Sequence, residues 1–319
     1  MGQHKFWKNI GEALRQVRFW AEAGAILLLL GMLRLLPLDV ASAIPGKLMR
    51  WIAPLTHRHK RAHKNLSAIM PELSKEQREE ILCSMWENMG RVFGEIPNLT
   101  RIASDKERFR FEGLEEARSI LAEGRGALAI SGHFSNWELT PAPSFVIPHP
   151  QLNFYRTINN PILDGILKRY REKICPNGLV PKGNHSLLHA MRALRKGQMV
   201  GMLVDQRTSG GLTVPFLGLP AETTHAPALL ACRHDAPILA GVVLREKGAR
   251  FKMICTQVPV SQTGDLNRDV EITTMAINAL LGTWVREHPH LWLWSHRRWR
   301  DIEAKASQGI ETPRETINA

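Results

Sequence analysis

The stretch from Ala127 to Glu138 places a histidine just after a short apolar run, with a carboxylate five residues further on. A neutral imidazole can take a proton from a hydroxyl group, and a carboxylate beside it can fix its tautomer and stabilise the imidazolium. His133 and Glu138 are therefore candidates for a general base and the group that orients it. The pair alone does not identify an enzyme, because such a histidine more often only ends a strand while the glutamate faces solvent.

A strand must position this histidine. The run 127–130 is too short and too uniformly apolar for an amphipathic helix, and glycines stand on both sides of it. It predicts a strand with His133 in the loop that follows. Asn136 or Ser135 can then cap a helix, whose first turn would hold Glu138 close to the imidazole.

Further motifs strengthen this interpretation. Gly132-His133-Phe-Ser-Asn136-Trp137-Glu138 resembles the His-x4-Asp/Glu signature of glycerolipid-type acyltransferases, and more narrowly the late acyltransferases of bacterial lipid A synthesis. The resemblance runs from about residue 10 to 300, and its other motifs follow in the family's order: Asn88 and Glu95 in a helical part, Arg156-x-x-Asn159-Asn160-Pro161-x-Leu-Asp164, Asp205-Gln206-Arg207, Val214-Pro215-Phe216-Leu-Gly218, and Leu293-Trp294-Ser-His296-Arg297-Arg298-Trp299.

The resemblance implies an acyltransferase of lipid A and lipopolysaccharide biosynthesis. The donor would be the thioester of an acyl carrier protein, and the acceptor a hydroxyl of a lipid A precursor, an anionic glycolipid. His133 would be the general base and Glu138 its orienter, with Asn136 as a possible oxyanion donor. No cofactor is implied, and no nucleophile for a covalent acyl-enzyme is evident. Both substrates should therefore be held in one complex.

Two arginines and an aspartate complete the candidate site. Arg156 follows a predicted strand and Arg171 lies on a predicted helix; the planar guanidinium suits a phosphate, although such residues are commonly surface cations. The resemblance favours both as contacts to an anionic substrate. Asp205 ends a strongly apolar strand, where a carboxylate needs a partner. We expect it to organise the pocket by pairing with Arg207 or another cation.

The charge distribution points to a membrane surface. The chain of 319 residues carries a formal charge of +12, which calls for an anionic partner. Through residue 64 there are eleven Lys and Arg against three acidic residues, and this cluster adjoins the most apolar run of the chain. The position of the charge therefore favours anionic lipid over nucleic acid.

The N-terminal segment has the pattern of a membrane anchor. A basic amphipathic helix from about Phe6 leads into the run 23–38, whose sixteen residues are marginal for crossing a bilayer. We expect an anchor that lies in the membrane or barely spans it, on the cytoplasmic face of the inner membrane. A secretory signal peptide is the alternative, but Glu12, Glu22 and Arg34 disfavour it.

The remaining pattern predicts an α/β protein with a central mixed sheet flanked by helices. Strands and helices alternate from Arg108 onward, after a capping box at Ser74 and Gln77 that opens a long helix. We divide the chain into an anchor (1–45), a helical segment (46–105), an acyltransferase domain (106–303) and a polar tail (304–319). Residues 46–303 should fold as one unit.

Other sites are disfavoured. The four cysteines are scattered and predict reduced thiols, and His185 and His189 lack a third metal ligand, so no metal site is expected. The Trp- and Arg-rich ending could stack single-stranded nucleic acid, but we expect it to close the fold. Two alternative functions stay open: acylation of a glycerol-phosphate, lysophospholipid or other glycolipid, and a non-catalytic basic protein that docks on membrane or nucleic acid.

Overall fold

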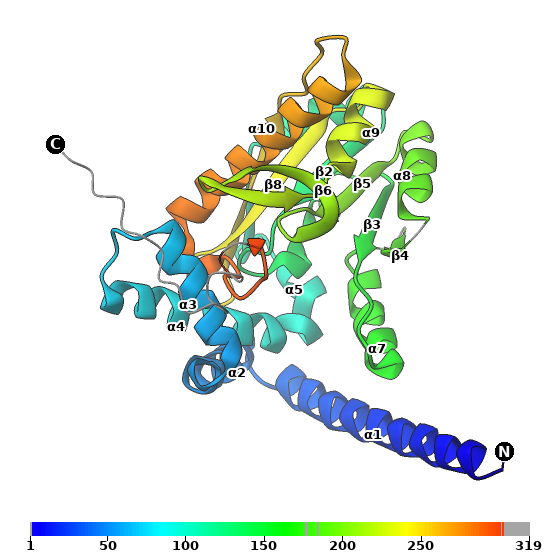
Figure 1. Cartoon of the computed structure of the whole chain (residues 1–319), viewed down its shortest axis with the longest axis vertical. Helices are drawn as coiled ribbons and strands as arrows, with labels where there is room; N and C mark the ends of the chain where they lie inside the picture. The colour runs from blue at the N-terminus through cyan, green and yellow to red at the C-terminus, as the bar shows by residue number, and fades with distance from the viewer. Residues whose placement is uncertain (1, 176–177, 184, 301, 303–319) are drawn as a thin grey trace.

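The computed structural model describes residues 2–175, 178–183, 185–300 and 302. A long N-terminal helix leads into a group of helices, and these are followed by a layered α/β part (Figure 1). The predicted polar tail, 304–319, lies outside the described residues.

The α/β part is built on a seven-stranded sheet in the order β1-β9-β8-β2-β5-β3-β4. All neighbouring strands run parallel except β8 and β9, so the sheet is mixed, as predicted. The central position of β2 follows from its sequence, because an apolar run without alternation suits a strand covered on both faces. The strands are β1 (Phe109–Glu112), β2 (Ala127–Ser131), β3 (Gln151–Tyr155), β4 (Leu179–Pro181), β5 (Met199–Leu203), β8 (Ile238–Arg245) and β9 (Phe251–Val258).

Helices cover both faces of the sheet. Leu128 and Ile130 of β2 pack in a core shared with α8, α9 and α10, whereas Ala127 packs in a second core with α6. The two faces therefore carry alternate residues of each strand, as strand geometry requires. The helices here are α6 (Leu114–Ala122), η3 (Trp137–Leu139), η4 (Ala142–Phe145), α7 (Pro161–Glu172), α8 (Ser186–Arg195), α9 (Ala226–His234), α10 (Leu266–Glu287) and η5 (Pro289–Leu291).

A separate antiparallel hairpin was not predicted. Strands β6 (Arg207–Phe216) and β7 (Leu219–Thr223) pair beyond the end of β5, and α9 follows them. Prolines and glycines inside this stretch, such as Pro215, obscured the strand pattern because they are uncommon within strands. The hairpin is held by Arg298, whose buried guanidinium donates to Thr223 Oγ1 at 2.8 Å and lies over the Phe216 ring.

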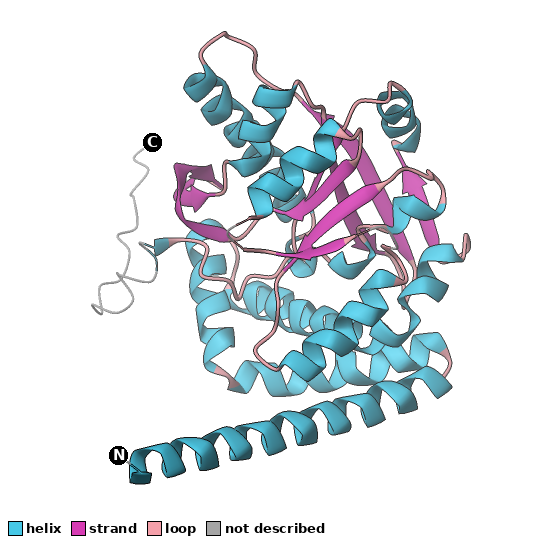
Figure 2. Ribbon diagram, turned by 90° about the vertical axis from the view of Figure 1, so that its right-hand side faces the viewer, coloured by secondary structure: helices cyan, strands magenta, loops and turns pink. Residues whose placement is uncertain are grey.

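A layer of helices lies below the sheet, and α1 runs along its outer side (Figures 1 and 2). The capping box predicted at the start of α4 is present, since Ser74 Oγ accepts from Gln77 N–H and the Gln77 side chain accepts from Ser74 N–H. The helices of this part are α1 (Gly2–Leu35), α2 (Leu38–Ile52), η1 (Ala53–Leu55), α3 (His57–Ile69), α4 (Lys75–Glu95), η2 (Ile96–Asn98) and α5 (Leu99–Ser104).

The first two helices expose large apolar side chains. The stretch Gly11–Leu35 of α1 is long and apolar enough to cross a membrane. Helix α2 adds Leu48 and Trp51, which are 58% and 78% exposed. Its opposite side packs closely on α4. The division of the chain at residues 45, 105 and 303 stays a prediction.

Candidate active site

The loop after β2 carries His133, as predicted, and is fixed on two sides. Ser135 lies in the left-handed region with φ 45°, and its N–H donates to Leu291 O at 2.8 Å. On the other side, Asn88 of α4 donates its amide to Ser135 O at 3.0 Å. A helix from the N-terminal part and the C-terminal segment thus hold the turn that presents the histidine.

The carboxylate beside His133 is Asp205. Its Oδ1 lies 2.8 Å from His133 Nδ1, and its Oδ2 accepts from the His133 N–H at 2.7 Å and the Trp292 indole N–H at 2.9 Å. Burial opposes ionisation of this fully buried carboxyl, but the charge and hydrogen bonds of His133 outweigh it and hold the Asp205 pKa below its usual range. An ionised Asp205 fixes the proton on His133 Nδ1, so Nε2 is free to accept one.

A glutamine connects His133 to a second histidine. Gln206 Nε2 lies 3.1 Å from His133 Nε2 and 3.0 Å from His296 Nε2. An amide nitrogen can donate to both rings if each Nε2 is unprotonated. Burial, reinforced by the nearby His133, lowers the pKa of His296 to about 4, so His296 is neutral at pH 7. Gln206 therefore stabilises the tautomer in which His133 can act as a base.

Glu138 does not contact the imidazole as expected; Arg171 binds it instead. Arg171 Nε and Nη2 donate to the two carboxylate oxygens at 2.7 and 2.6 Å. Asn136 caps a single 3-10 turn at η3 in place of the expected helix. Two parallel charged hydrogen bonds are stronger than one bond to an imidazole, which explains why the arginine takes this carboxylate.

The other predicted residues have different surroundings. Asn136 is fully buried; its amide donates to Glu95 at 2.7 Å and its oxygen accepts from Glu138 N–H, so these contacts support the loop rather than face a substrate. Arg156 follows β3 and is exposed at the cavity described next. Of the partners expected for Asp205, Arg207 binds Glu222 of the hairpin instead, and Asp205 pairs with His133.

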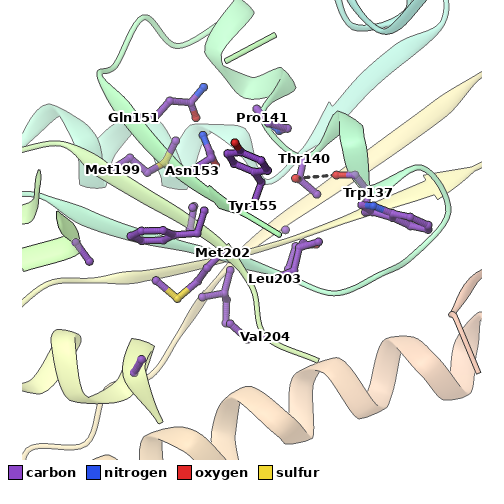
Figure 3. A pocket seen from close by; sticks show the side chains of 18 of the residues that line it. Trp137, Thr140, Pro141, Gln151, Asn153, Tyr155, Met199, Met202, Leu203 and Val204 are labelled. Carbon is purple, nitrogen blue, oxygen red and sulfur yellow. Dashed lines mark hydrogen bonds between the residues drawn. The ribbon is translucent and has the colours of Figure 1, made fainter. Parts of the chain in front are cut away.

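A cavity of about 900 Å³ adjoins these residues. His133, Trp137, Arg156 and Arg171 line it, but most of its lining is apolar, including Met199, Met202 and Val204 (Figure 3). Such a cavity suits a hydrocarbon chain with a few polar groups at one end. Within the described part of the chain, no group of three or more His, Cys, Asp or Glu side chains could hold a metal ion.

Sequence reasoning quoted Gln206 and His296 within motifs but gave neither a place beside His133. Trp292, which donates to Asp205, was assigned only to the closing segment. The signal was their position after an apolar strand and in a Trp-x-His sequence. The sheet order β2-β5 brings Gln206 to His133, and pairing of the C-terminal segment with the His133 loop at Phe134 and Trp292 brings His296 there. Trp292, Trp294 and Trp299 are at most 1% exposed, so these rings close the fold and are not a surface for stacking bases.

Comparison with known proteins shows the family of this chain. The family model described as bacterial lipid A biosynthesis acyltransferase matches residues 9–301. The chain is 25% identical over 253 residues to a lipid A biosynthesis lauroyltransferase of Escherichia coli K12, which covers 77% of this chain and 80% of that protein. It is 24% identical over 252 residues to a palmitoleoyltransferase of the same pathway and strain, with the same coverage. A lipid A biosynthesis acyltransferase of Haemophilus influenzae is 23% identical over 293 residues, covering 87% of this chain and 86% of that protein. This chain therefore belongs to the bacterial lipid A biosynthesis acyltransferase family.

Proposed function

We propose that this acyltransferase moves a fatty acyl chain from an acyl-carrier-protein thioester to a free hydroxyl of a 3-hydroxyacyl chain on the lipid A precursor, with His133 as general base and Asp205 as its orienting group. The observation that carries the proposal is the His133–Asp205 contact of 2.8 Å, on a histidine that lines the cavity and whose other ring nitrogen lies beside the cavity residue Gln206. Asp205 thus takes the role that sequence reasoning gave to Glu138.

The reaction follows from this arrangement. The acceptor hydroxyl replaces Gln206 as the partner of His133 Nε2 and gives its proton to that nitrogen while its oxygen attacks the thioester carbonyl carbon. Asp205 stabilises the imidazolium that forms. The tetrahedral intermediate then collapses, the carbon–sulfur bond breaks, and His133 returns the proton to the leaving thiolate. The product is a secondary ester, and no acyl-enzyme is required.

Arg171 is suited to an anionic part of the acceptor. Its Nε and Nη2 are held by Glu138, but its Nη1 is buried without a hydrogen-bond partner while the side chain lines the cavity. A buried donor left unpaired is costly, and a phosphate or sugar oxygen would satisfy it. Glu138 therefore orients Arg171, and the exposed Arg156 at the same cavity adds a second cation.

The N-terminal helices support a position of this chemistry at a membrane. The apolar surface of α1 and α2 would enter the bilayer, and the surrounding cations would meet anionic headgroups. A lipid A precursor carries its acyl chains in a membrane, and an acyl-carrier-protein donor is cytoplasmic. We place the enzyme on the cytoplasmic face of the inner membrane.

Three single variants test the mechanism. In purified full-length enzyme, His133→Ala should lower turnover by about 100- to 10,000-fold, the range for losing a positioned general base. Asp205→Asn should cause a similar loss because it favours the wrong tautomer. Glu138→Gln should be milder and act mainly on the KM of the acceptor, since it weakens the hold on Arg171.

Turnover is measured with acyl-carrier-protein thioester and lipid A precursor, with circular dichroism as the control for folding. A well-folded His133→Ala protein with unchanged turnover would refute the role of His133 as general base, whereas a wild-type protein without any transfer would favour a binding protein. A loss in Glu138→Gln that exceeds the loss in Asp205→Asn would return the orienting role to Glu138. Preference for glycerol-phosphate or lysophospholipid over the lipid A precursor would refute the proposed acceptor.

A further inference from the structure

The cavity occupies both faces of the sheet. Ala129 pairs with Gly201 of β5 and Leu239 of β8, and these residues line the cavity on the face covered by α6. Ile130 and Met202, one position further along their strands, also line it but point to the face covered by α8 and α9. In Figure 3, the side chains of Met202 and Val204 point to one side of the sheet, and those of Asn153 and Tyr155 point to the other side. Adjacent strand residues face opposite sides, so the sheet divides the cavity into an α6-side branch and an α9-side branch.

The two branches meet at the catalytic histidine. Strands β2 and β5 end at Ser131 and Leu203, and His133 and Gln206 line the cavity just beyond these ends. A molecule in either branch can therefore bring one end to His133 Nε2.

The ester formed in the proposed reaction also has two hydrocarbon arms. One arm extends from the carbonyl carbon and comes from the donor; the other extends from the carbon that carried the hydroxyl and belongs to the acceptor. We propose that each branch holds one arm: the α6-side branch takes the chain being transferred, and the α9-side branch takes the hydroxyacyl chain of the acceptor. This inference rests on the proposed function and adds a separate site for the acceptor chain.

The α6-side branch suits a chain that enters alone. Ala129, Gly201 and Gly241 of the sheet line this branch beneath α6, and the side chains of Asn153 and Met253 lie close to the two glycines. The lining continues to Met199 and Gln151 at the first residues of β5 and β3, so the branch follows about five strand residues, or roughly 17 Å. A branch of this length can take the free end of a donor chain.

The α9-side branch suits a chain that stays attached to a polar body. It is bordered by the β6 residues Ser209 and Gly210, which are exposed, and by Leu187 of α8, which is 40% exposed. An opening of this kind lets the rest of a glycolipid remain outside while one apolar chain lies against Met202 and Leu230. Arg156, exposed at the same cavity, is available to the polar part.

Two matched substitutions separate the branches. Ala129→Leu adds bulk on the α6 side, and Ala226→Leu adds the same bulk on the α9 side at the start of α9. Full-length enzyme in detergent micelles is given lipid A precursor and a competing mixture of acyl-carrier-protein thioesters of increasing chain length. Mass spectrometry of the product then reports the preferred donor, and acceptor titration reports its KM.

The inference predicts opposite effects. Ala129→Leu should shift the product toward shorter transferred chains by on the order of ten-fold or more, since one methylene in an apolar pocket changes specificity by about 10- to 200-fold. It should leave the acceptor KM as in wild type. Ala226→Leu should raise the acceptor KM by on the order of ten-fold without changing the donor preference. If either variant misfolds, Gly241→Ala on the α6 side and Leu229→Phe on the α9 side replace them.

Reversed effects, or a change of donor preference in both variants, would overturn the assignment of the branches while leaving wild-type transfer intact. Absence of any transfer by the wild-type enzyme would instead overturn the proposed function. The two failures are therefore distinguishable.

Discussion

His296 makes the site sensitive to acid through stability as well as chemistry. Burial lowers its pKa to about 4, whereas an unfolded histidine titrates near 6.5, so the unfolded chain binds more protons between these values. The free energy of unfolding therefore falls as the pH drops from about 6.5 to 4. A shift of this size corresponds to on the order of 3 kcal/mol, and most of this loss should appear before Asp205 titrates.

Urea unfolding curves at a series of pH values check this prediction. His296→Gln should flatten the dependence between pH 6.5 and 4, because the buried titrating ring is gone. His57→Gln, at an exposed position on α3, is the matched control and should leave the curve as in wild type. An unchanged acid dependence in His296→Gln would show that another group is responsible.

At the scale of elements, we expect α2 to join α1 in contact with the membrane. Leu48 and Trp51 are exposed on α2, and burying such a side chain in an apolar phase is worth about 1.5 to 3 kcal/mol. Leu48→Glu and Trp51→Glu should each weaken binding to anionic vesicles by roughly ten-fold or more. Removal of α1 alone should leave residual binding through α2.

Vesicle co-sedimentation measures this binding. Leu266→Glu, on α10, changes a residue that is 37% exposed away from these helices and should not alter binding. Equal loss from Leu266→Glu, or none from the two α2 variants, would refute the assigned surface.

The elements that carry a strong local pattern were predictable from sequence. The alternation of strands and helices predicted from Arg108 onward is present, and the strand predicted at 127–130 extends by one residue to Ser131 as β2. The His133–Asp205 contact was not predictable, because it depends on β5 lying next to β2 in the sheet, 72 residues away along the chain. Glu138 was nearer in sequence, but its local turn directs it to Arg171. The spacing of motifs along the chain identified residues of the site more reliably than it identified which of them contact each other.

At the scale of the molecule, one buried carboxylate joins three parts of the fold. Glu95 of α4 accepts from Ser42 of α2 at 2.6 Å and Asn136 of the catalytic loop at 2.7 Å, and it pairs with Arg245 of β8. Its side chain is fully buried and that of Arg245 is 8% exposed. Removing one member of such a pair leaves a buried charge without compensation, which typically costs about 3 to 5 kcal/mol.

Glu95→Ala should therefore lower the free energy of unfolding by about this amount and reduce turnover through the loosened loop. Chemical denaturation measures the first effect and the acyl-transfer assay the second. The double variant Glu95→Leu/Arg245→Leu should recover part of the stability, because the uncompensated charge is gone. A Glu95→Ala protein as stable as wild type would contradict the role of this residue as a junction.

The contact between α2 and α4 is made by backbone. A methyl group added at Gly90 would lie 2.2 Å from Pro45 O, and one added at Gly94 would lie 2.1 Å from Ala41 O. Helix α2, which we propose meets the lipid, and helix α4, which supports the His133 loop, therefore have little freedom to slide on each other. With the proposed membrane contact, this backbone contact sets the distance of His133 from the bilayer, and that distance cannot change without remodelling the two helices.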